Sequence, residues 1–458
     1  MLPLSEEAAD WTWDRALTAL HSALRFGVHP SLAGIEAVMD ALGRPQDAMS
    51  IVQVTGTNGK TSVVRMAAAL LSAHGRRVGV YTSPHLCSYS ERARVLGDPR
   101  TATYAQAIGM AATTARGAGL ELTEFELLTA SALWLFAESE VDIAVLEVGM
   151  GGRWDATSVA NAAVAVVTGV ALDHVERLGS TVAEIAADKA HIIKAASTAV
   201  LGPGVGPQAA PEIVSRAARV GAHAWAVARA REPSPLPEDR TARFRIVSRP
   251  GEPGGLTTVD VVGMHGSYGG VAMSAPSYQA ANIATALVAA EAALARGLRA
   301  DAARHAFAEL EIAGRFQLAA DRPVPIVLDG AHNPQAAGVL AEAIREAFPE
   351  GERRPVAVLG VLQDKDARGI VEALAPAVSG FVVTAPISDR ALAPESLAAI
   401  VRDATGEDPR VVATVAGALD AALGSEPRAI VVTGSLVTVG EALSILDEPA
   451  AVDDGGRT

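Results

Sequence analysis

Residues 51–62 read I-V-Q-V-T-G-T-N-G-K-T-S, an apolar run followed by a loop between two glycines and a Lys-Thr pair. Successive backbone N–H groups of such a loop can surround phosphate oxygens, and Lys60 can add a positive charge. Thr61 can place a hydroxyl on a magnesium ion, and a following helix directs its positive end at the same point. The stretch therefore predicts a strand, a phosphate-binding loop and a helix.

The spacing of this loop departs from the commonest phosphate-loop signature, G-x-x-x-x-G-K-[ST]. Counting back from Gly59 places Val54 where the first glycine of that signature would stand. Gly-Thr-Asn-Gly also occurs in ordinary turns, but strand, loop, Lys-Thr and helix follow one another in the order that phosphate binding requires. The shorter loop is compatible with fewer classes of nucleotide-binding protein than the common signature.

Length and composition restrict the function classes. The chain has 458 residues, which predicts two domains. Its net charge of −14 argues against nucleic acid and against an anionic membrane surface as partners. Cys87 is the only cysteine, which excludes an internal disulfide and a cysteine-based zinc site. The acidic N-terminus is no secretory signal, and no uncharged apolar run reaches about 18 residues. We therefore expect a cytoplasmic protein.

Apolar strand-like runs alternate with helical patterns, which predicts a largely parallel sheet covered by helices. The expected strands of a first domain lie at 51–54, 78–82, 142–148 and 163–168. The expected helices lie at 61–74, 104–117, 125–137, 182–194 and 277–296. Residues 242–248 and 256–262 read as an antiparallel pair at a sheet edge. A second alternation has strands at 325–328, 356–360, 380–384, 410–412 and 429–433.

The expected fold class is therefore α/β. A large P-loop-type, mostly parallel sheet domain occupies 1–313 and includes a short N-terminal helical segment. A smaller Rossmann-like α/β domain occupies 314–447, and a tail at 448–458 is expected to be disordered.

Glu147 stands at the carboxyl end of the predicted strand 142–148, directly before a glycine-rich stretch. Ligands of open α/β sheets bind at the carboxyl ends of strands. A carboxylate there suits magnesium, because this ion prefers oxygen donors. The alternative is an acid that only caps the next loop. The neighbouring phosphate loop favours the metal interpretation.

Three other residues follow predicted strands or face the same edge. Ser83 could supply a hydroxyl ligand to the ion, although Ser-Pro alone is more often a turn. His174, alone, would usually be structural. Lys189 lies on a helix that Ser180 or Thr181 can cap. It could pair with phosphate, or react with carbon dioxide to give a carbamate, and the sequence leaves both open.

Weaker motifs lie further along the chain, at 278–282, 314–316, 329–334 and 434–436. Asn-Pro and Asp-Gly are common turns, so each motif is weak alone. Together they place polar groups at the carboxyl ends of strands in both domains, as an interdomain cleft requires.

These residues, in this order, resemble the folylpolyglutamate synthase and dihydrofolate synthase family, which belongs with the muramoyl-peptide ligases among ATP-dependent amide ligases. The resemblance covers about residues 31–441. The wider group shares G-T-N-G-K and D-H. The folate branch is marked by T-S-P-H-L at 82–86, S-E-R at 90–92, V-G-M-G-G-R-W-D-A-T at 148–157, D-G-A-H-N-P at 329–334 and G-S-L at 434–436.

The resemblance implies a role for each matching residue. The catalytic residues would be Lys60, Glu147, His174 and Lys189, with Lys189 matching a lysine that is carbamylated in relatives. ATP would be bound by Thr57, Asn58, Gly59, Lys60, Thr61, Ser62, Asn282, Arg315 and Asp329. One or two magnesium ions would be held by Thr61, Ser83, Glu147 and His174. The pterin acceptor or glutamate would be bound by Thr123, Phe125, Glu126, Asp155, Ala156, His332 and Ser435.

Three positions depart from the family pattern. Thr61 stands where many folate relatives carry glycine, which adds a hydroxyl near the ion. His191 replaces a frequent glycine after Lys189. Glu124 stands beside Phe125 where relatives often have an apolar residue, which predicts a differently shaped pterin pocket.

The resemblance implies ligation of L-glutamate to dihydropteroate, to reduced folates, or to both, through an acyl phosphate. Closure of two domains about a hinge near 312–323 would exclude water. The expected partners are these small molecules and ATP, with no nucleic acid or membrane, and the expected state is a monomer. A muramoyl-peptide ligase is the alternative, but only about 50 residues precede the phosphate loop, too few for the further domain those ligases usually carry. A nucleotide switch without ligase activity would leave the second-domain motifs without a purpose.

Overall fold

The computed structural model describes residues 2–23, 30–97, 102–320, 323–349 and 354–447. The tail at 448–458, expected to be disordered, lies outside these residues. The chain forms two compact units. The first comprises Met1–Val247, Thr258–Met273 and Gln279–Leu310, and the second comprises Ser248–Thr257, Ser274–Tyr278 and the described residues from Glu311 onward.

A ten-stranded sheet dominates the first unit, with the strand order β10-β9-β8-β7-β6-β5-β1-β4-β2-β3. Strand β1 lies between β4 and β5 and runs parallel to both. Its bounds, and those of the other strands, are β1 Ser50–Thr55, β2 Val78–Tyr81, β3 Ala93–Leu96, β4 Ile143–Glu147, β5 Val164–Gly169, β6 Thr198–Gly204, β7 His223–Arg229, β8 Thr241–Ser248, β9 Leu256–Val262 and β10 Ser267–Ser274. The mostly parallel sheet predicted from the alternating pattern is confirmed, because the pairs from β2 through β8 are parallel.

Two edge strands differ from the sequence-based expectation. Strand β3 pairs antiparallel with β2 at one edge. At the other edge stands β10, so β8 and β9, which were expected to form the edge, lie further inside the sheet. Gly269 and Gly270 lie within β10, and glycine weakens the strand pattern by which the sequence would have revealed it.

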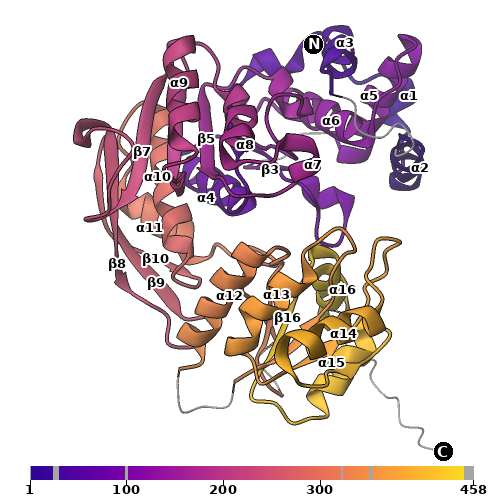
Figure 1. Cartoon of the computed structure of the whole chain (residues 1–458). Coiled ribbons are helices and arrows are strands. Elements are labelled where there is room, and N and C mark those ends of the chain that lie inside the picture. The colour runs from indigo at the N-terminus through magenta and orange to yellow at the C-terminus, as the bar shows by residue number, and fades with distance from the viewer. Residues whose placement is uncertain (1, 24–29, 98–101, 321–322, 350–353, 448–458) are drawn as a thin grey trace, which may run out of the picture. The chain divides into compact units, whose positions relative to one another are not determined.

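Helices cover both faces of this sheet (Figure 1). They are α1 Glu6–Ala9, α2 Trp13–Ala23, α3 Ala33–Ala41, α4 Lys60–Ala73, α5 Tyr104–Gly117, α6 Glu124–Glu138, α7 Val175–Leu178, α8 Val182–Lys189, α9 Ala210–Val220, α10 Gln279–Leu294 and α11 Ala300–Ala308. Helices α1, α2, α3, α5 and α6 share one apolar core with side chains of β1 and β4. Helices α8 and α9 share another with β5 and β6. Helix α4 packs against α10 and α11.

The second unit contains a six-stranded sheet with the order β11-β12-β16-β13-β14-β15. Its strands are β11 Gln317–Ala320, β12 Ile326–Leu328, β13 Val356–Leu359, β14 Gly380–Val383, β15 Arg410–Val411 and β16 Ile430–Thr433. Its helices are α12 Pro334–Ala347, α13 Ala367–Leu374, α14 Pro394–Thr405, α15 Val415–Leu423 and α16 Leu436–Asp447. The five predicted strands are confirmed and run parallel, and antiparallel β11 was not foreseen.

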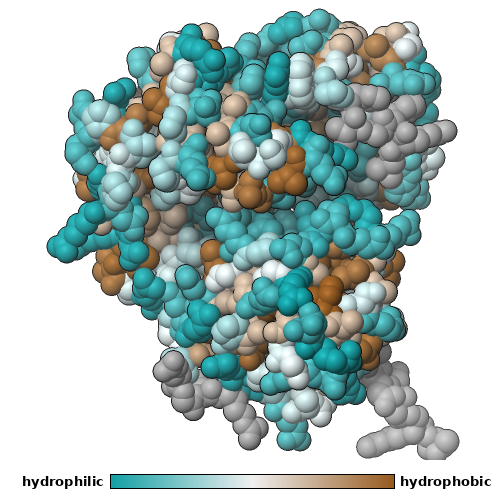
Figure 2. Space-filling model, viewed as in Figure 1, coloured by the Kyte–Doolittle hydropathy of each residue, from teal (hydrophilic) through white to brown (hydrophobic). Residues whose placement is uncertain are grey.

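Much of the surface in view is hydrophilic. Figure 2 shows hydrophilic residues over most of the viewed face, with apolar residues in small scattered groups. Within the described ranges, every helix falls short of the length or the apolar character that a bilayer span demands.

Candidate active site

The predicted phosphate loop connects β1 to α4 at the carboxyl edge of the large sheet. Strand β1 ends at Thr55 and α4 begins at Lys60, with Gly59 in the left-handed region at φ 84°. A Cβ atom on Gly59 would lie 2.7 Å from the Oδ1 atom of Asn282 on α10. Asn282, predicted to contact the nucleotide, is thus brought against the loop, and this position admits only glycine without a shift.

The end of β5 holds the other side of the loop. The Thr168 hydroxyl donates to the carbonyl oxygen of Asn58 at 2.6 Å. The backbone N–H of Ala171 donates to the Thr57 hydroxyl at 3.0 Å. A Cβ atom on Gly56 would lie 2.0 Å from the Thr168 hydroxyl. These contacts fix the loop before any ligand arrives, which is the preorganisation that phosphate binding benefits from.

Two lysines converge on this loop. The Nζ atom of Lys60 donates to the carbonyl oxygens of Gly56 at 3.0 Å and Thr57 at 3.1 Å. The Nζ atom of Lys189, from the last turn of α8, donates to the same Gly56 oxygen at 3.1 Å. Two ammonium groups on one carbonyl concentrate positive charge beside the loop.

Lys189 is only 4% exposed. Burial, and after it the positive charge of Lys60, lower its pKa to about 7, against the opposing effect of Asp173, Asp188 and Asp155. An amine with such a pKa is partly neutral near pH 7, so it can act as a nucleophile.

Thr61 and Glu147, each predicted to be a magnesium ligand, are hydrogen-bonded to each other. The Thr61 hydroxyl donates to Oε1 of Glu147 at 2.8 Å. The backbone N–H of Ser83 donates to Oε2 of the same carboxylate at 3.2 Å. Glu147 is 1% exposed, so its charge is buried beside the first turn of α4. These oxygen donors fit magnesium, a hard cation that often takes only one or two protein ligands and keeps several waters.

His174 has different surroundings from Thr61, Ser83 and Glu147. It has φ 50° at the N-cap of the short helix α7, and its Nε2 lies 3.9 Å from Oδ2 of Asp173. Its side chain is 43% exposed. Among the described residues, no group of three or more His, Cys, Asp and Glu side chains forms a metal cluster.

Ser62 is the last of the predicted loop residues. It is buried, and its hydroxyl accepts a hydrogen bond from the Gln279 side chain at 3.3 Å. Gln279 in turn accepts one from the Asn282 amide at 2.7 Å. These hydrogen bonds link the start of α4 to the start of α10 through Gln279, which belongs to the predicted motif at 278–282 but was assigned no role.

The residues predicted to hold the acceptor lie around the start of α6 and the loop after β4. The Phe125 ring is so close to Gly149 that a Cβ atom there would lie 2.8 Å from Cζ of Phe125. The ring centroids of Phe125 and Tyr81 are 6.1 Å apart. Phe125 is thus an aromatic wall beside the glycine-rich loop, a suitable surface for a flat heterocycle.

Several neighbours of Phe125 already have structural partners. Thr123 and Glu126 form a capping box at the start of α6, with the Thr123 N–H donating to Glu126 at 2.8 Å. The Asp155 carboxylate accepts from the N–H groups of Met150 and Thr157, each at 3.0 Å. Burial raises the pKa of Asp155. Ala156, directly after Asp155, is buried at the start of a 3-10 turn.

Gln53 is a buried functional neighbour that the sequence analysis missed. Its amide nitrogen donates to the hydroxyls of Thr157 at 2.9 Å and Ser158 at 3.2 Å. The Ser158 hydroxyl donates to the Gly152 carbonyl at 2.6 Å. Gln53 therefore supports the loop that carries Asp155. The available signal was a glutamine within an otherwise apolar strand.

The second unit holds the remaining predicted residues at the carboxyl ends of its own strands. Asp329 is 5% exposed and accepts from the Tyr278 hydroxyl at 3.1 Å and the Phe316 N–H at 2.9 Å. Burial raises its pKa, and the Arg315 charge opposes this effect. Arg315 donates to the Gly314 carbonyl at 3.0 Å.

His332 and Ser435 complete that set. The His332 Nδ1 atom lies 2.8 Å from the Gly330 carbonyl oxygen. Ser435 is buried, and its hydroxyl accepts from the Thr438 N–H at 3.1 Å at the start of α16. Both residues follow strand ends, β12 for His332 and β16 for Ser435, as the motifs predicted.

Comparison with known families gives two matches. The model for the Mur ligase middle domain matches residues 54–203, and the model for the Mur ligase glutamate ligase domain matches residues 314–436. The first contains the phosphate loop, Glu147 and Lys189, and the second contains Asp329 and His332.

Individual relatives align along almost the whole chain. The chain is 37% identical over 457 residues to a dihydrofolate synthase/folylpolyglutamate synthase of Mycobacterium tuberculosis, covering 91% of this chain and 90% of that protein. A crystal structure of Mycobacterium tuberculosis folylpolyglutamate synthase complexed with ADP and AMPPCP has a TM-score of 0.84 and 36% identity, covering 95% of this chain and 99% of that one. A bifunctional folylpolyglutamate synthase/dihydrofolate synthase with Mn, AMPPNP and L-glutamate bound has a TM-score of 0.80 and 28% identity, covering 96% and 99%.

Proposed function

The chain belongs to the folylpolyglutamate synthase/dihydrofolate synthase family of ATP-dependent amide-bond ligases, and we propose that it joins L-glutamate to a pterin-containing carboxylic acid. The acceptor is dihydropteroate, a reduced folate, or both. The observation that carries the proposal is the Thr61–Glu147 pair, 2.8 Å apart, directly after the phosphate loop. That arrangement suits transfer of a phosphoryl group rather than simple nucleotide storage.

The chemistry follows from the poor reactivity of a carboxylate, whose oxygen leaves badly. An acceptor carboxylate oxygen attacks the γ-phosphorus of ATP, which gives an acyl phosphate and ADP. The glutamate amine then attacks the acyl carbon and loses a proton. Inorganic phosphate leaves with the bridging oxygen, and an amide remains. Relatives were solved with ADP, AMPPCP or AMPPNP, which supports ATP as the co-substrate of this chain.

The chain's own residues prepare the phosphoryl transfer. Lys60 supplies positive charge where the transferred group develops negative charge. Thr61 and Glu147, with Ser83 and His174, would hold one or two magnesium ions. When bound, magnesium neutralises charge on the nucleotide phosphates. The manganese in one related structure supports a divalent metal here.

We assign Lys189 a carbamate role. Its partly neutral amine can attack carbon dioxide, forming an N–C bond and releasing a proton. The product is an anion in a place where the free lysine is a cation. That change would relieve the repulsion between Lys189 and Lys60, which contributes to the low pKa of Lys189.

An assay that compares two acceptor substrates identifies the acceptor. Purified protein with ATP, magnesium and L-glutamate should convert dihydropteroate to dihydrofolate, measured by mass spectrometry. A reduced folate monoglutamate, tested in parallel, should gain one glutamate if the enzyme also extends chains. Absence of product with every pterin acceptor would refute the proposed function.

A further inference from the structure

Glu124, the first residue of α6, carries a buried carboxylate oxygen. Within the part of the chain that the structure describes, its Oε1 has no hydrogen-bond partner. The neighbouring residues of this helix start are fully engaged, since Thr123 and Glu126 bind each other in the capping box. A buried carboxylate oxygen without a donor is costly, because it has lost water without gaining a replacement.

The aromatic residues around Glu124 define where this oxygen lies. The pKa of Tyr89 is raised to about 12 by burial, by a side-chain hydrogen bond with Glu124 and by the charge of that carboxylate, so among the described residues only Oε1 of Glu124 is without a partner. Burial also raises the pKa of Tyr81, and the charges of Asp155 and Glu124 both add to this effect. Two carboxylates therefore lie near Tyr81, whose ring neighbours that of Phe125.

Arg92, whose charge acts on Tyr81 and Tyr89, has other partners. The Arg92 guanidinium donates from Nε to Nδ1 of His85 at 2.9 Å and lies over the Tyr89 ring, 5.1 Å from its centroid. Its positive charge partly opposes the rise in the pKa values of both tyrosines. Arg92 thus moderates the negative potential around these rings without bonding to the buried Oε1 of Glu124.

The carboxylate of Asp155 differs from that of Glu124 in its hydrogen bonds. Its Oδ1 accepts from the N–H and the hydroxyl of Thr157, and its Oδ2 accepts from the Met150 N–H. Both oxygens therefore hold the loop after β4 in place. Of the two carboxylates near Tyr81, Glu124 is the one with an oxygen left for a ligand.

We propose that Glu124 determines acceptor specificity by accepting hydrogen bonds from the adjacent amino and ring N–H donors of a 2-aminopyrimidinone ring. In this arrangement the face of the ring stacks on Phe125. This inference rests on the proposed function and deepens it, because it names the residue that reads the heterocycle. A carboxylate matches two neighbouring N–H donors, and such charge-assisted bonds are stronger than neutral ones. The ligand supplies the donors that the buried oxygen lacks.

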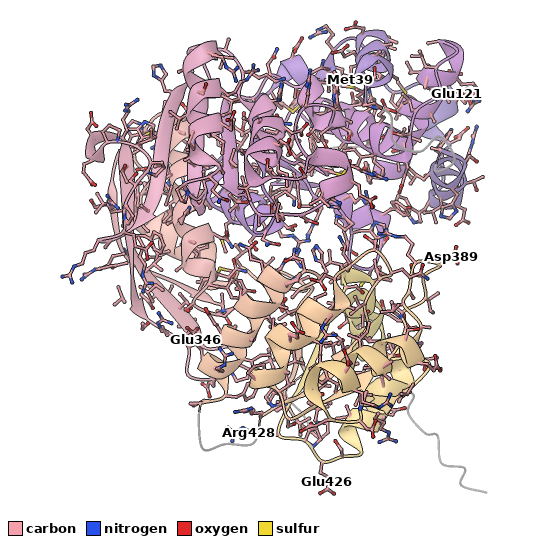
Figure 3. All side chains as sticks on the ribbon, viewed as in Figure 1. Met39, Glu121, Glu346, Asp389, Glu426 and Arg428 are labelled. Atoms are coloured by element: carbon pink, nitrogen blue, oxygen red, sulfur yellow. The ribbon has the colours of Figure 1, made fainter. Side chains whose placement is uncertain are left out.

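The test compares dihydropteroate with its 2-desamino analogue, which lacks the exocyclic donor. Steady-state kinetics are measured for the wild type, for Glu124→Leu and for Glu124→Gln. The control is Glu121→Leu, because Glu121 is an exposed glutamate just before α6, labelled in Figure 3. The KM for ATP and thermal melting with ADP report whether each variant is folded.

The wild type and Glu121→Leu should prefer dihydropteroate by about 10- to 100-fold in kcat/KM. Glu124→Leu should reduce this preference to about threefold or less, mainly through the KM for dihydropteroate, and leave the KM for ATP unchanged. Glu124→Gln, which keeps the shape and loses the charge, should show an intermediate preference.

Three outcomes would overturn the inference. The first is that Glu124→Leu retains the wild-type preference for dihydropteroate. The second is that Glu124→Gln retains this preference, which decides the case if the leucine variant does not melt cooperatively. An active wild type that does not distinguish the two acceptors also contradicts it. By contrast, a wild type that makes no product with any pterin would contradict the proposed function itself.

Discussion

Lys60 and Lys189 donate hydrogen bonds to one and the same carbonyl oxygen, that of Gly56, at 3.0 and 3.1 Å. One lysine comes from the phosphate loop and the other from the end of α8, more than a hundred residues later. The shared partner brings the two amines close together, and the positive charge of Lys60 contributes to the low pKa of Lys189.

The low pKa of Lys189 predicts a pH-dependent stability. Folding lowers the pKa from 10.5 to about 7, so between these values the unfolded chain binds the additional proton. The free energy of unfolding of the wild type should therefore rise, relative to Lys189→Met, as the pH increases from about 7 towards 10. The full change is on the order of 4 kcal/mol. Urea unfolding in carbon-dioxide-free buffer measures it, and parallel pH profiles of the two proteins would contradict the assignment.

Gly59 should be intolerant of a side chain for two separable reasons. Its φ of 84° disfavours any other residue, and a Cβ atom would meet Asn282. Gly75→Ala is the matched control, because Gly75 has φ 77° but no atom within 4 Å of a Cβ. We expect Gly59→Ala to raise the KM for ATP at least about tenfold and to cost about 1–3 kcal/mol of stability. Gly75→Ala should cost about 1 kcal/mol and leave the KM for ATP unchanged; equal KM values would contradict the contact.

Thr61 should contribute directly to the magnesium requirement. Thr61→Val keeps the shape and removes the hydroxyl that contacts Glu147. The magnesium concentration for half-maximal activity should rise at least about tenfold. Thr113→Val is the control, since the Thr113 hydroxyl donates to carbonyls of its own helix, at Gly109 and Met110. If Thr61→Val leaves the magnesium requirement unchanged, this hydroxyl has no role in binding magnesium.

The fold was predictable where hydrophobic periodicity was strong. Strands β1, β2, β4 and β5 and the helices between them appear within a few residues of the predicted positions. Strand β10 escaped notice because its two glycines carry no side-chain pattern, and β11 because it pairs irregularly with β12. The family resemblance is confirmed by relatives that align along nearly the whole chain.

Site residues were predictable where the residue type and its position at the carboxyl edge of the sheet together indicate a role. Thr61 and Glu147 meet as expected, because β1 and β4 are neighbours that run parallel. The roles of Gln53 and Gln279 depend on three-dimensional hydrogen bonding that no local pattern encodes. The substrate roles of Thr123, Glu126 and Asp155 stay predictions, since their observed partners lie within the chain.

The central claim is that ATP activates the acceptor carboxylate as an acyl phosphate. The most direct test uses dihydropteroate labelled with ¹⁸O in its carboxyl group, incubated with ATP, magnesium and L-glutamate. Mass spectrometry of the released phosphate should show one ¹⁸O atom per molecule of amide formed, and Lys60→Ala should release none. Amide formation with unlabelled phosphate, or phosphate release that does not depend on glutamate and acceptor, would contradict the account.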